Sequence, residues 1–321
     1  MREIWAAVSR HVVVTSLFFL PKARRIAVER RMRGEEEYRK LQRADWVLIS
    51  WGKSGRTWFR VMLSRFYQVK HHLPINRLLE FDNLHRMNPA VPKVFFSHNN
   101  YMRDFLKDWD TLNHFRGKKI VLLVRDPRDV AVSQFFQWKY RMRPHKKRLN
   151  QYPVHGSDTG VWAFVTNPDC GIPRIVDFFN GWAGYLAEFG NDILIIRYED
   201  MRQDPAGVMA KVLAFVGTPG TPQQIDKAVE FASYENMKKL EEKSLFKGSG
   251  ARVKPGDKKN PNSYKVRRGK VGGYRDYFED EQVIEIDRLV EQGLDPVFGY
   301  GGGPANTVAQ NEDVRASRHR V

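Results

Sequence analysis

The chain has 321 residues, of which 42% are hydrophobic and 12% aromatic, so it can bury a sizeable core and global disorder is excluded. Its single cysteine, Cys170, excludes a disulfide framework and a cysteine-rich zinc site. The formal net charge of +17 favours an anionic partner, such as a nucleic acid, an anionic lipid or a multiply charged cofactor.

The first 44 residues predict a helical extension ahead of the main domain. No apolar run reaches the ~18–20 residues of a membrane span, so a transmembrane helix is not predicted. Residues 3–20 favour an amphipathic or core helix, with an interfacial membrane anchor and a cleaved signal peptide as alternatives. Residues 22–45 predict an arginine-rich helix. Its charge would suit an anionic leaflet, so residues 1–45 are a candidate membrane-surface contact.

Four short apolar runs, each bounded by turn residues, predict the strands of a parallel sheet: 47–50, 94–97, 120–124 and 193–196. Helical patterns alternate with them, at about 55–68, 127–141, 174–189, 205–216, 223–231 and 280–292. The alternation predicts an α/β fold over residues 45–300, a three-layer sandwich with a central parallel sheet.

Two segments depart from this alternation. Residues 243–275 carry eleven Lys and Arg against the single acid Asp257 and are rich in Gly and Pro, which predicts a long basic loop. A loop of that length inside a compact domain is usually functional or disordered. Residues 301–321 begin with three glycines and are polar, which predicts a disordered tail.

The first predicted strand leads into a turn rich in Gly and Ser, Ser50-Trp51-Gly52-Lys53-Ser54-Gly55-Arg56-Thr57-Trp58. Backbone N–H groups in such a turn, the following helix N-terminus and a lysine together make a cradle for phosphate. The run Gly52-Lys53-Ser54 matches the end of a Walker A motif, but Val47 stands where that motif requires glycine. The turn predicts an anion site, with a plain basic turn as the alternative.

The same turn resembles the Y-P-K-S-G-T-T-W loop of sulfotransferases that use PAPS (3′-phosphoadenosine-5′-phosphosulfate) and release PAP, the matching bisphosphate. In that family the loop holds the 5′-phosphosulfate. The resemblance implies that the cofactor is bound by Lys53, Ser54, Gly55, Arg56, Thr57 and Trp58, with Lys53 stabilising the leaving phosphate. Arg56, Trp51 and Gly52 depart from the family pattern, and Arg56 either adds a charge near the phosphosulfate or points to solvent.

Further blocks occur in the family's order, so that the resemblance spans roughly residues 45–280. The segment 124–133 resembles the R-(N/D)-P-(K/R)-D-x-x-x-S block, which implies that Arg125 and Ser133 grip the 3′-phosphate. Pairing of Arg125 with Asp129 at the strand end is the structural alternative.

A second block, Arg267-Arg268-Gly269, resembles the R-K-G-x-x-G loop that closes over the 3′-phosphate. Arg268 keeps the charge of the usual lysine, whereas Gly273 replaces the usual aspartate. The resemblance implies that Arg267, Arg268 and Gly269 bind the cofactor. A solvated basic loop is the alternative.

Two weaker blocks complete the predicted cofactor site. Tyr198, in a segment that resembles Y-E-D-L-x-x-D-P, either brings its hydroxyl near the cofactor or caps the core. Ser233 and Tyr234 stand in a segment that resembles S-F-x-x-M-K, which borders the adenine site in the family, and they are further cofactor candidates.

A histidine follows the second predicted strand. His98 stands where the carboxyl end of a parallel strand faces the ligand crevice, and a histidine can accept a proton near neutral pH. Its segment resembles the P-R-x-x-K-T-H-L-P block that carries the family's catalytic base, although Asn99 and Asn100 replace Leu-Pro. The resemblance implies that His98 is the general base.

These observations predict a cytoplasmic enzyme that moves the sulfuryl group of PAPS to a hydroxyl or amine of a small-molecule or lipid-like acceptor. No metal is expected, because Lys and Arg supply the positive charge, and no nucleic-acid partner is expected, because no nucleic-acid-binding motif is present. Two alternatives remain open. One is a P-loop kinase or NTPase that uses Gly52-Lys53-Ser54 and holds Mg²⁺ on Asp126, and the other is a basic nucleic-acid or membrane-binding protein.

Overall fold

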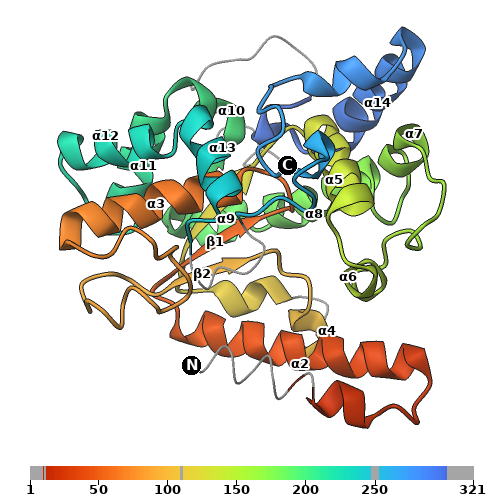
Figure 1. Cartoon of the computed structure of the whole chain (residues 1–321), viewed down its shortest axis with the longest axis horizontal. Helices are drawn as coiled ribbons and strands as arrows, with labels where there is room; N and C mark the ends of the chain where they lie inside the picture. Colours follow the sequence, from red (N-terminus) through yellow and green to blue (C-terminus); the bar gives the residue numbers. More distant parts are fainter. Residues whose placement is uncertain (1–9, 11, 109–110, 247–252, 302–321) are drawn as a thin grey trace, which may run out of the picture.

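A computed structural model describes residues 10, 12–108, 111–246 and 253–301. Four parallel strands form one sheet in the order β2-β1-β3-β4, with bounds β1 Trp46–Ser50, β2 Val94–Ser97, β3 Lys119–Val124 and β4 Ile193–Arg197 (Figure 1). In the register, Trp46 lies opposite both Val94 and Lys119 on its two neighbours. The four predicted strands and their parallel arrangement are confirmed.

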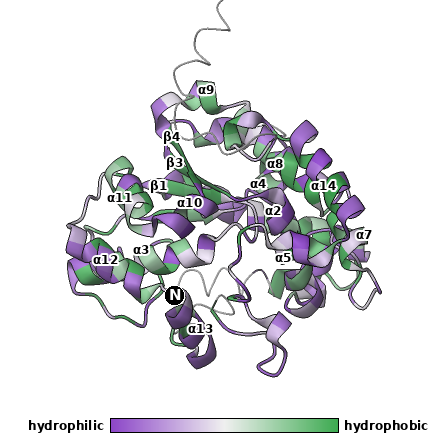
Figure 2. Cartoon of the chain, turned by 90° about the horizontal axis from the view of Figure 1, so that it is seen from above, coloured by the Kyte–Doolittle hydropathy of each residue, from purple (hydrophilic) through white to green (hydrophobic). Residues whose placement is uncertain are grey.

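Alternate strand residues feed two hydrophobic clusters, one on each face of the sheet. Val47 and Ile49 pack in the first cluster, whereas Trp46 and Leu48 pack in the second. The first face is covered by α2 (Lys22–Arg43), α4 (Met102–Leu106), α5 (Pro127–Tyr140), α8 (Ile172–Ala183) and α14 (Asp280–Gly293). The second face is covered by α3 (Arg56–His71), α11 (Pro205–Phe215), α12 (Pro222–Phe231) and α13 (Tyr234–Lys243). Figure 2 shows the hydrophobic strands enclosed between these helices, which confirms the three-layer sandwich.

Local sequence signals set several helix starts. Asp126 caps α5 by accepting a hydrogen bond from the Arg128 backbone N–H at 2.9 Å, and Pro127 occupies the first helical turn, where no intrahelical N–H bond is lost. Thr221 and Gln224 form a reciprocal capping box at α12. The Asp126 cap places the start of α5 directly after β3, so Arg125 is held between a strand end and a helix start.

Several elements differ from the prediction. The expected helix over 174–189 ends at Ala183, and a separate turn, α9 (Leu186–Phe189), follows Gly184. The helices α10 (Tyr198–Gln203), α13, α6 (Pro144–Leu149) and α7 (Val161–Val165) were not predicted. Three of them are only five or six residues long, too short for a periodic pattern to stand out, and α13 is ten residues long and highly charged.

The basic segment 243–275 is largely irregular, as expected. Its described part contains only the short 3₁₀ turns η3 (Pro261–Ser263) and η4 (Gly273–Tyr277) after the end of α13. Residues 247–252 of this segment, and the predicted tail beyond residue 301, lie outside the described residues.

The N-terminal extension packs against the domain through α2. The Arg30 guanidinium forms a two-pronged ion pair with Asp104, at 3.0 and 2.9 Å, and donates to the Leu149 carbonyl at 2.7 Å. α2 confirms the arginine-rich helix predicted over residues 22–45. Of the helix predicted over residues 3–20, residues 12–16 are helical, whereas residues 3–9 and 11 lie outside the described residues. Within the described ranges, the helices fall short of the length and apolarity that crossing a membrane requires.

Candidate active site

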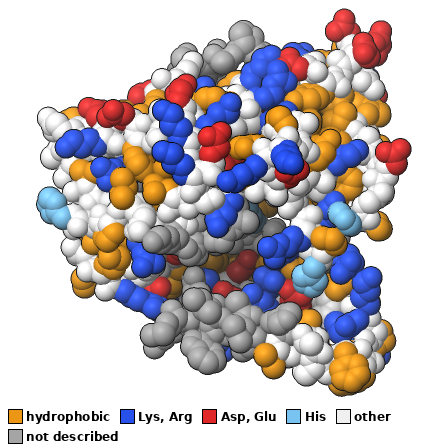
Figure 3. Space-filling view, in the orientation of Figure 1, with side chains coloured by type: hydrophobic (Ala, Val, Ile, Leu, Met, Phe, Trp, Pro, Cys, Tyr) orange, Lys and Arg blue, Asp and Glu red, His pale blue; other side chains and the backbone are white. Residues whose placement is uncertain are grey.

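A cleft of about 540 Å³ opens at the carboxyl ends of the strands. It brings together most of the predicted site residues: Lys53, Gly55, Arg56, Thr57, Trp58, His98, Arg125, Ser133, Tyr198, Arg267, Arg268 and Gly269. Ser54 and Ser233 do not line it. Figure 3 shows Lys and Arg side chains gathered around the hollow on this face of the molecule. Lys53 and Arg268 are more than 200 residues apart in the sequence, and the fold brings both to the same edge of the sheet.

The phosphate loop has the backbone shape that its glycine requires. Gly55 has φ +101°, and a Cβ atom there would lie 2.6 Å from the Tyr198 ring, so no other residue fits without displacing that ring. Lys53 also has a positive φ, 75°. The Ser54 hydroxyl is buried and has no hydrogen-bond partner among the described residues. A strained loop with an unused buried hydroxyl at a helix start suits an anion.

The amine of Lys53 lies in a strongly cationic environment. Burial, followed by the charges of Arg141 and Arg125, lowers the pKa of Lys53 to about 7. Lys265 also lines the cleft, and burial together with Lys53 and Arg141 lowers its pKa well below the ordinary value. Sequence motifs did not single out Lys265, and its only signal was its place in the basic segment. Both amines regain their charge most easily beside a bound polyanion.

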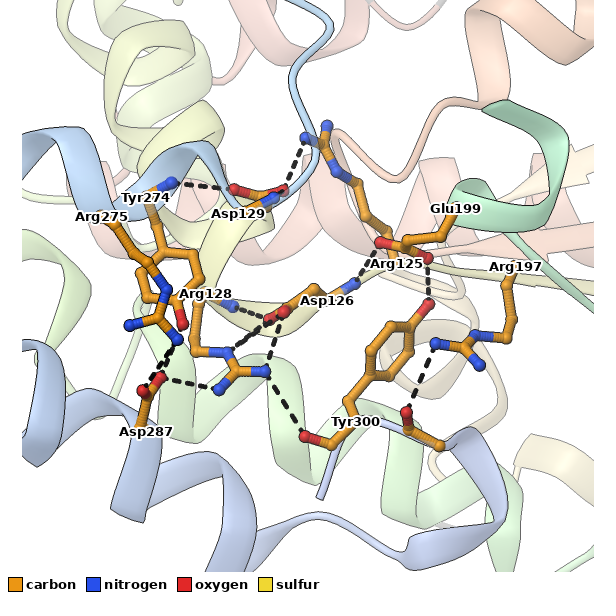
Figure 4. Close-up of polar contacts among 12 residues, drawn as sticks. Arg125, Asp126, Arg128, Asp129, Arg197, Glu199, Tyr274, Arg275, Asp287 and Tyr300 are labelled. Carbon is orange, nitrogen blue, oxygen red and sulfur yellow. Dashed lines mark hydrogen bonds and ion pairs between the residues drawn. The ribbon is translucent and has the colours of Figure 1, made fainter. Parts of the chain in front are cut away.

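Asp129 joins the 3′-phosphate candidates to the basic loop. Its Oδ2 accepts from the Arg125 guanidinium at 3.2 Å and from the Gly272 backbone N–H at 3.0 Å, and its Oδ1 accepts from the Tyr274 N–H at 3.0 Å (Figure 4). Arg125 also donates to the Lys270 carbonyl at 3.2 Å. The alternative pairing of Arg125 with Asp129 is therefore present, and the same carboxylate holds the basic loop next to Arg125.

The neighbouring Asp126 serves a structural network. Both of its carboxylate oxygens accept from the Arg128 guanidinium, which also pairs with Asp287 of α14 at 2.7 Å (Figure 4). Tyr300 donates to Glu199 at 2.5 Å, and Glu199 accepts from the Asp126 backbone N–H. Because Arg128 occupies the Asp126 carboxylate, this side chain is poorly suited to hold the Mg²⁺ of a nucleotide kinase.

His98 is held in one tautomer by its contacts. Its Nδ1 lies 2.6 Å from the Ser50 carbonyl oxygen, which can only accept, so Nδ1 carries the proton. Its Nε2 lies 2.5 Å from the Arg56 guanidinium, which can only donate, so Nε2 carries the lone pair. Burial, followed by the Arg56 charge, lowers the pKa of His98 well below its ordinary value. The imidazole of this cleft residue is therefore neutral at neutral pH, with its basic nitrogen beside Arg56.

Aromatic side chains also line the cleft, close to the helix that follows the phosphate loop. The Trp58 ring packs edge-on against Tyr198, with ring centroids 5.9 Å apart, and its indole N–H donates to the Ala232 carbonyl at 2.8 Å. The Tyr234 hydroxyl donates to the Arg267 carbonyl at 3.1 Å. Ser233, by contrast, caps α13 through the Asn236 backbone N–H, so its hydroxyl is used in the helix start.

The two loop arginines differ in exposure. Arg267 stacks on Phe136, with its guanidinium carbon 3.8 Å from the ring centroid, and donates to the Tyr277 hydroxyl. Arg268 stands at the rim, where its side chain is 44% exposed and pairs with Asp276 at 2.6 Å. Arg267 is thus positioned by packing, whereas Arg268 remains in contact with solvent.

Comparison with known proteins identifies the class. The family model for the sulfotransferase domain matches residues 43–297, so the chain belongs to that family. It is 28% identical to cytosolic sulfotransferase 17 of Arabidopsis thaliana over 80% of this chain and 76% of that protein. It is 24% identical to the amine sulfotransferase of Oryctolagus cuniculus, over 78% of this chain and 80% of that protein.

Solved structures share the fold. Mouse sulfotransferase SULT7A1 complexed with PAP superposes with a TM-score of 0.52, at 21% identity, over 81% of this chain and 89% of that chain. Retinol dehydratase in complex with androsterone and the inactive cofactor PAP gives a TM-score of 0.51, at 18% identity, over 77% and 79% of the two chains. With the family match, these findings confirm the predicted PAPS-dependent sulfotransferase, whose reaction is the transfer of a sulfuryl group. The family match therefore decides against the kinase and binding-protein alternatives.

Proposed function

We propose that this sulfotransferase moves the sulfuryl group of PAPS to a hydroxyl of a small-molecule or lipid-like acceptor, with an amine as the less favoured nucleophile. The observation that carries the proposal is the tautomer of His98, which leaves a lone pair on Nε2 in a residue that lines the same cleft as Lys53. A neutral imidazole at that place can accept the acceptor's proton.

The residues of the cleft suit the two anionic ends of the cofactor. On the 5′ side, the loop N–H groups, the unused Ser54 hydroxyl and Lys53 would hold the phosphosulfate. Lys265, which lies beside Lys53, adds a second cation there. The 3′-phosphate would be bound by Arg125, Ser133, Arg267, Arg268 and Gly269, while Trp58, Tyr198 and Tyr234 would border the adenine.

The chemical step then follows from charge and position. His98 Nε2 takes the proton of the acceptor hydroxyl, whose oxygen replaces the Arg56 guanidinium as the partner of Nε2 and forms the new bond to sulfur. As the bond between sulfur and the bridging oxygen breaks, Lys53 donates a hydrogen bond to the phosphate oxygen that leaves with the electron pair. Positioning and electrostatic stabilisation supply the catalysis, as in phosphoryl transfer.

A histidine substitution tests the general base. His98→Ala should lower kcat about 10²–10⁴-fold and leave the affinity for PAP nearly unchanged, because the base acts on the acceptor. His155→Ala, at an exposed histidine outside the cleft, is the matched control. Sulfated product is measured by mass spectrometry, and near-normal turnover in His98→Ala would remove His98 from the role.

The cofactor placement has its own test. PAP should raise the melting temperature of the protein more than ATP with Mg²⁺ does, because cations from several loops line the cleft and Arg128 occupies the carboxylate of Asp126, the candidate metal ligand. Lys53→Ala and Arg125→Ala should each weaken PAP binding about 10-fold or more, as the loss of a charge-assisted hydrogen bond does. Unchanged PAP affinity in both variants would refute the placement.

The N-terminal segment supports a cytoplasmic enzyme that attaches to the surface of an anionic leaflet. Phe18 and Phe19 are 77% and 68% exposed, and Lys22, Arg24 and Arg25 follow them in sequence. Exposed aromatic side chains beside cations are the composition of interfacial segments. In Figure 3 a group of hydrophobic side chains stands at the lower right edge, where Figure 1 places the helical turn before α2.

Vesicle cosedimentation tests this attachment. The double variant Phe18→Asp/Phe19→Asp should lose most binding to vesicles that contain phosphatidylserine, because each Phe loses about 1.5–3 kcal/mol of apolar burial. Val154→Asp, at a residue that is 74% exposed, controls for added charge. Equal binding of both variants would contradict the membrane contact and leave sulfuryl transfer untouched.

A further inference from the structure

The cleft has a second half, whose walls come mainly from α2, α4 and α8, which supply none of the predicted cofactor residues. Arg30 of α2, Arg103 of α4 and Arg174 of α8 all line it. α4 begins four residues after His98, so this half lies on the side of the general base. Arg30 belongs to the N-terminal helix, which precedes the segment matched by the family model.

Arg30 fixes the position of this wall. Its guanidinium pairs with Asp104, donates to the Leu149 carbonyl, and donates to the Asn100 carbonyl at 3.3 Å. It thereby ties α2 to Asn100 and Asp104, which lie three residues before and one residue after Arg103. Arg30 is a positioning residue here, because its donors are used by the protein.

Arg103 and Arg174 carry positive charge into the same space. Both residues line one cleft, and burial, followed by the charge of Arg174, lowers the pKa of Arg103. The Arg174 side chain is half-buried and makes no hydrogen bond or ion pair with any other described residue. Asp169 and Asp177 also line this half, but they are exposed and form no ion pair with these arginines within the described ranges.

Two aromatic side chains form one part of the wall in this half. Trp51, which stands in the phosphate loop, packs edge-on against Phe178 of α8 with ring centroids 5.2 Å apart. Arg174 lies one helical turn before Phe178 on α8, so a charged group and an aromatic wall face the cleft from one helix. Such a wall suits an acceptor in which a ring or another flat apolar group lies between the reacting hydroxyl and a charged end.

From these observations we infer that the acceptor carries an anionic oxygen group, a carboxylate or a phosphate, which Arg103 and Arg174 bind while the acceptor hydroxyl lies at His98. Guanidinium groups bind such anions through paired charge-assisted hydrogen bonds. Arg174, which has no hydrogen-bond or ion-pair partner among the described residues, gains one when such an anion binds. The inference rests on the proposed function, and it adds the charge of the substrate.

Matched acceptors test the inference on the full-length protein saturated with PAP. The first pair is 4-hydroxyphenylacetate and its methyl ester, and the second is 4-hydroxybenzylphosphonate and its dimethyl ester. Isothermal titration should show each anion binding about 10- to 100-fold more tightly than its ester, the range expected for charge-assisted hydrogen bonds. The pair with the larger ratio distinguishes a carboxylate from a phosphate-like group.

Arginine variants assign the effect to this wall. Arg103→Ala and Arg174→Ala should each raise the Kd of the anions about 10-fold while changing the Kd of the esters and of PAP little, and Arg174→Lys should restore part of the loss. Arg288→Ala, at an exposed arginine of α14, is the control. With PAPS in place of PAP, the same variants should raise KM for the anions more than they change kcat.

The outcomes separate this inference from the proposed function. If PAP binds but esters bind as tightly as anions, or if no anion binds, the inference is overturned and the cofactor site stands. Equal loss for both members of a pair in the arginine variants would also overturn it, because the arginines would then only shape the wall. If PAP itself fails to bind the unaltered protein, the proposed cofactor placement fails first.

Discussion

Replacing Asp129 with asparagine tests whether one carboxylate couples the 3′-phosphate arginine to the basic loop. Three donors meet on its two oxygens: the Arg125 guanidinium at 3.2 Å and the backbone N–H groups of Gly272 and Tyr274, each at 3.0 Å. An asparagine has one carbonyl oxygen, and its NH₂ group would face a donor. At least one buried N–H therefore loses its acceptor, and Arg125 loses its ionic partner.

The magnitude follows from these contacts. A buried donor without a partner costs about 1–3 kcal/mol, and a hydrogen bond to a charged group contributes about 1.5–3 kcal/mol. Since asparagine keeps one acceptor, we expect Asp129→Asn to lower the free energy of unfolding by about 2–4 kcal/mol. For a domain of this size each kcal/mol moves Tm by about 2–4 °C, so Tm should fall by about 4–16 °C.

The assay combines thermal unfolding with PAP titration. Because the loop that carries Arg267 and Gly269 is no longer held beside Arg125, the Kd for PAP should rise about 10-fold or more. Asp226→Asn, at an exposed carboxylate of α12, should change neither quantity. A variant at Asp129 with the normal Tm and the normal PAP affinity would refute the coupling.

Three further predictions concern the phosphate loop and its cations. Gly55→Ala should abolish measurable PAP binding, since its Cβ atom would lie 2.6 Å from the Tyr198 ring at a residue with φ +101°. The control is Gly117→Ala, at a residue with φ +73° and open space around it, which should cost only about 1 kcal/mol of stability. Similar effects of the two substitutions would contradict the steric argument. PAP affinity should fall by up to about 10-fold per pH unit between pH 7 and 9, because Lys53 has a pKa of about 7 in the free protein and a bound anion raises that pKa. Calorimetry in buffers of different ionisation enthalpy should show that the protein takes up a proton when PAP binds. Proton release instead would exclude protonation of Lys53 as the cause. Lys265→Met should weaken PAP binding about 10-fold but leave the Tm of the free protein equal or higher, because the substitution removes a buried amine that Lys53 repels. A lower Tm would show instead that Lys265 stabilises the free protein.

Local sequence patterns predicted much of the sheet and most of the cofactor cleft. Each strand is a short apolar run, which makes it predictable, and the resemblance of the motifs to those of sulfotransferases implied that Lys53, Arg125 and Arg267 share one site. The helix over 174–189 was predicted as continuous, but it ends at Ala183, because Gly184 does little to continue a helix. Boundaries of this kind depend on a few residues, so periodicity locates them poorly.

The sequence by itself determined the class of the protein, since the chemistry of a phosphate loop depends on neighbouring residues along the chain. Only the tertiary structure decided which distant groups share an electrostatic environment. Lys265 meets Lys53, Asp129 holds Gly272, and Arg174 faces Arg103, in each case through segments brought together by packing. The physical reason is that Coulomb energies and hydrogen bonds depend on distance in space, which separation along the chain does not reveal.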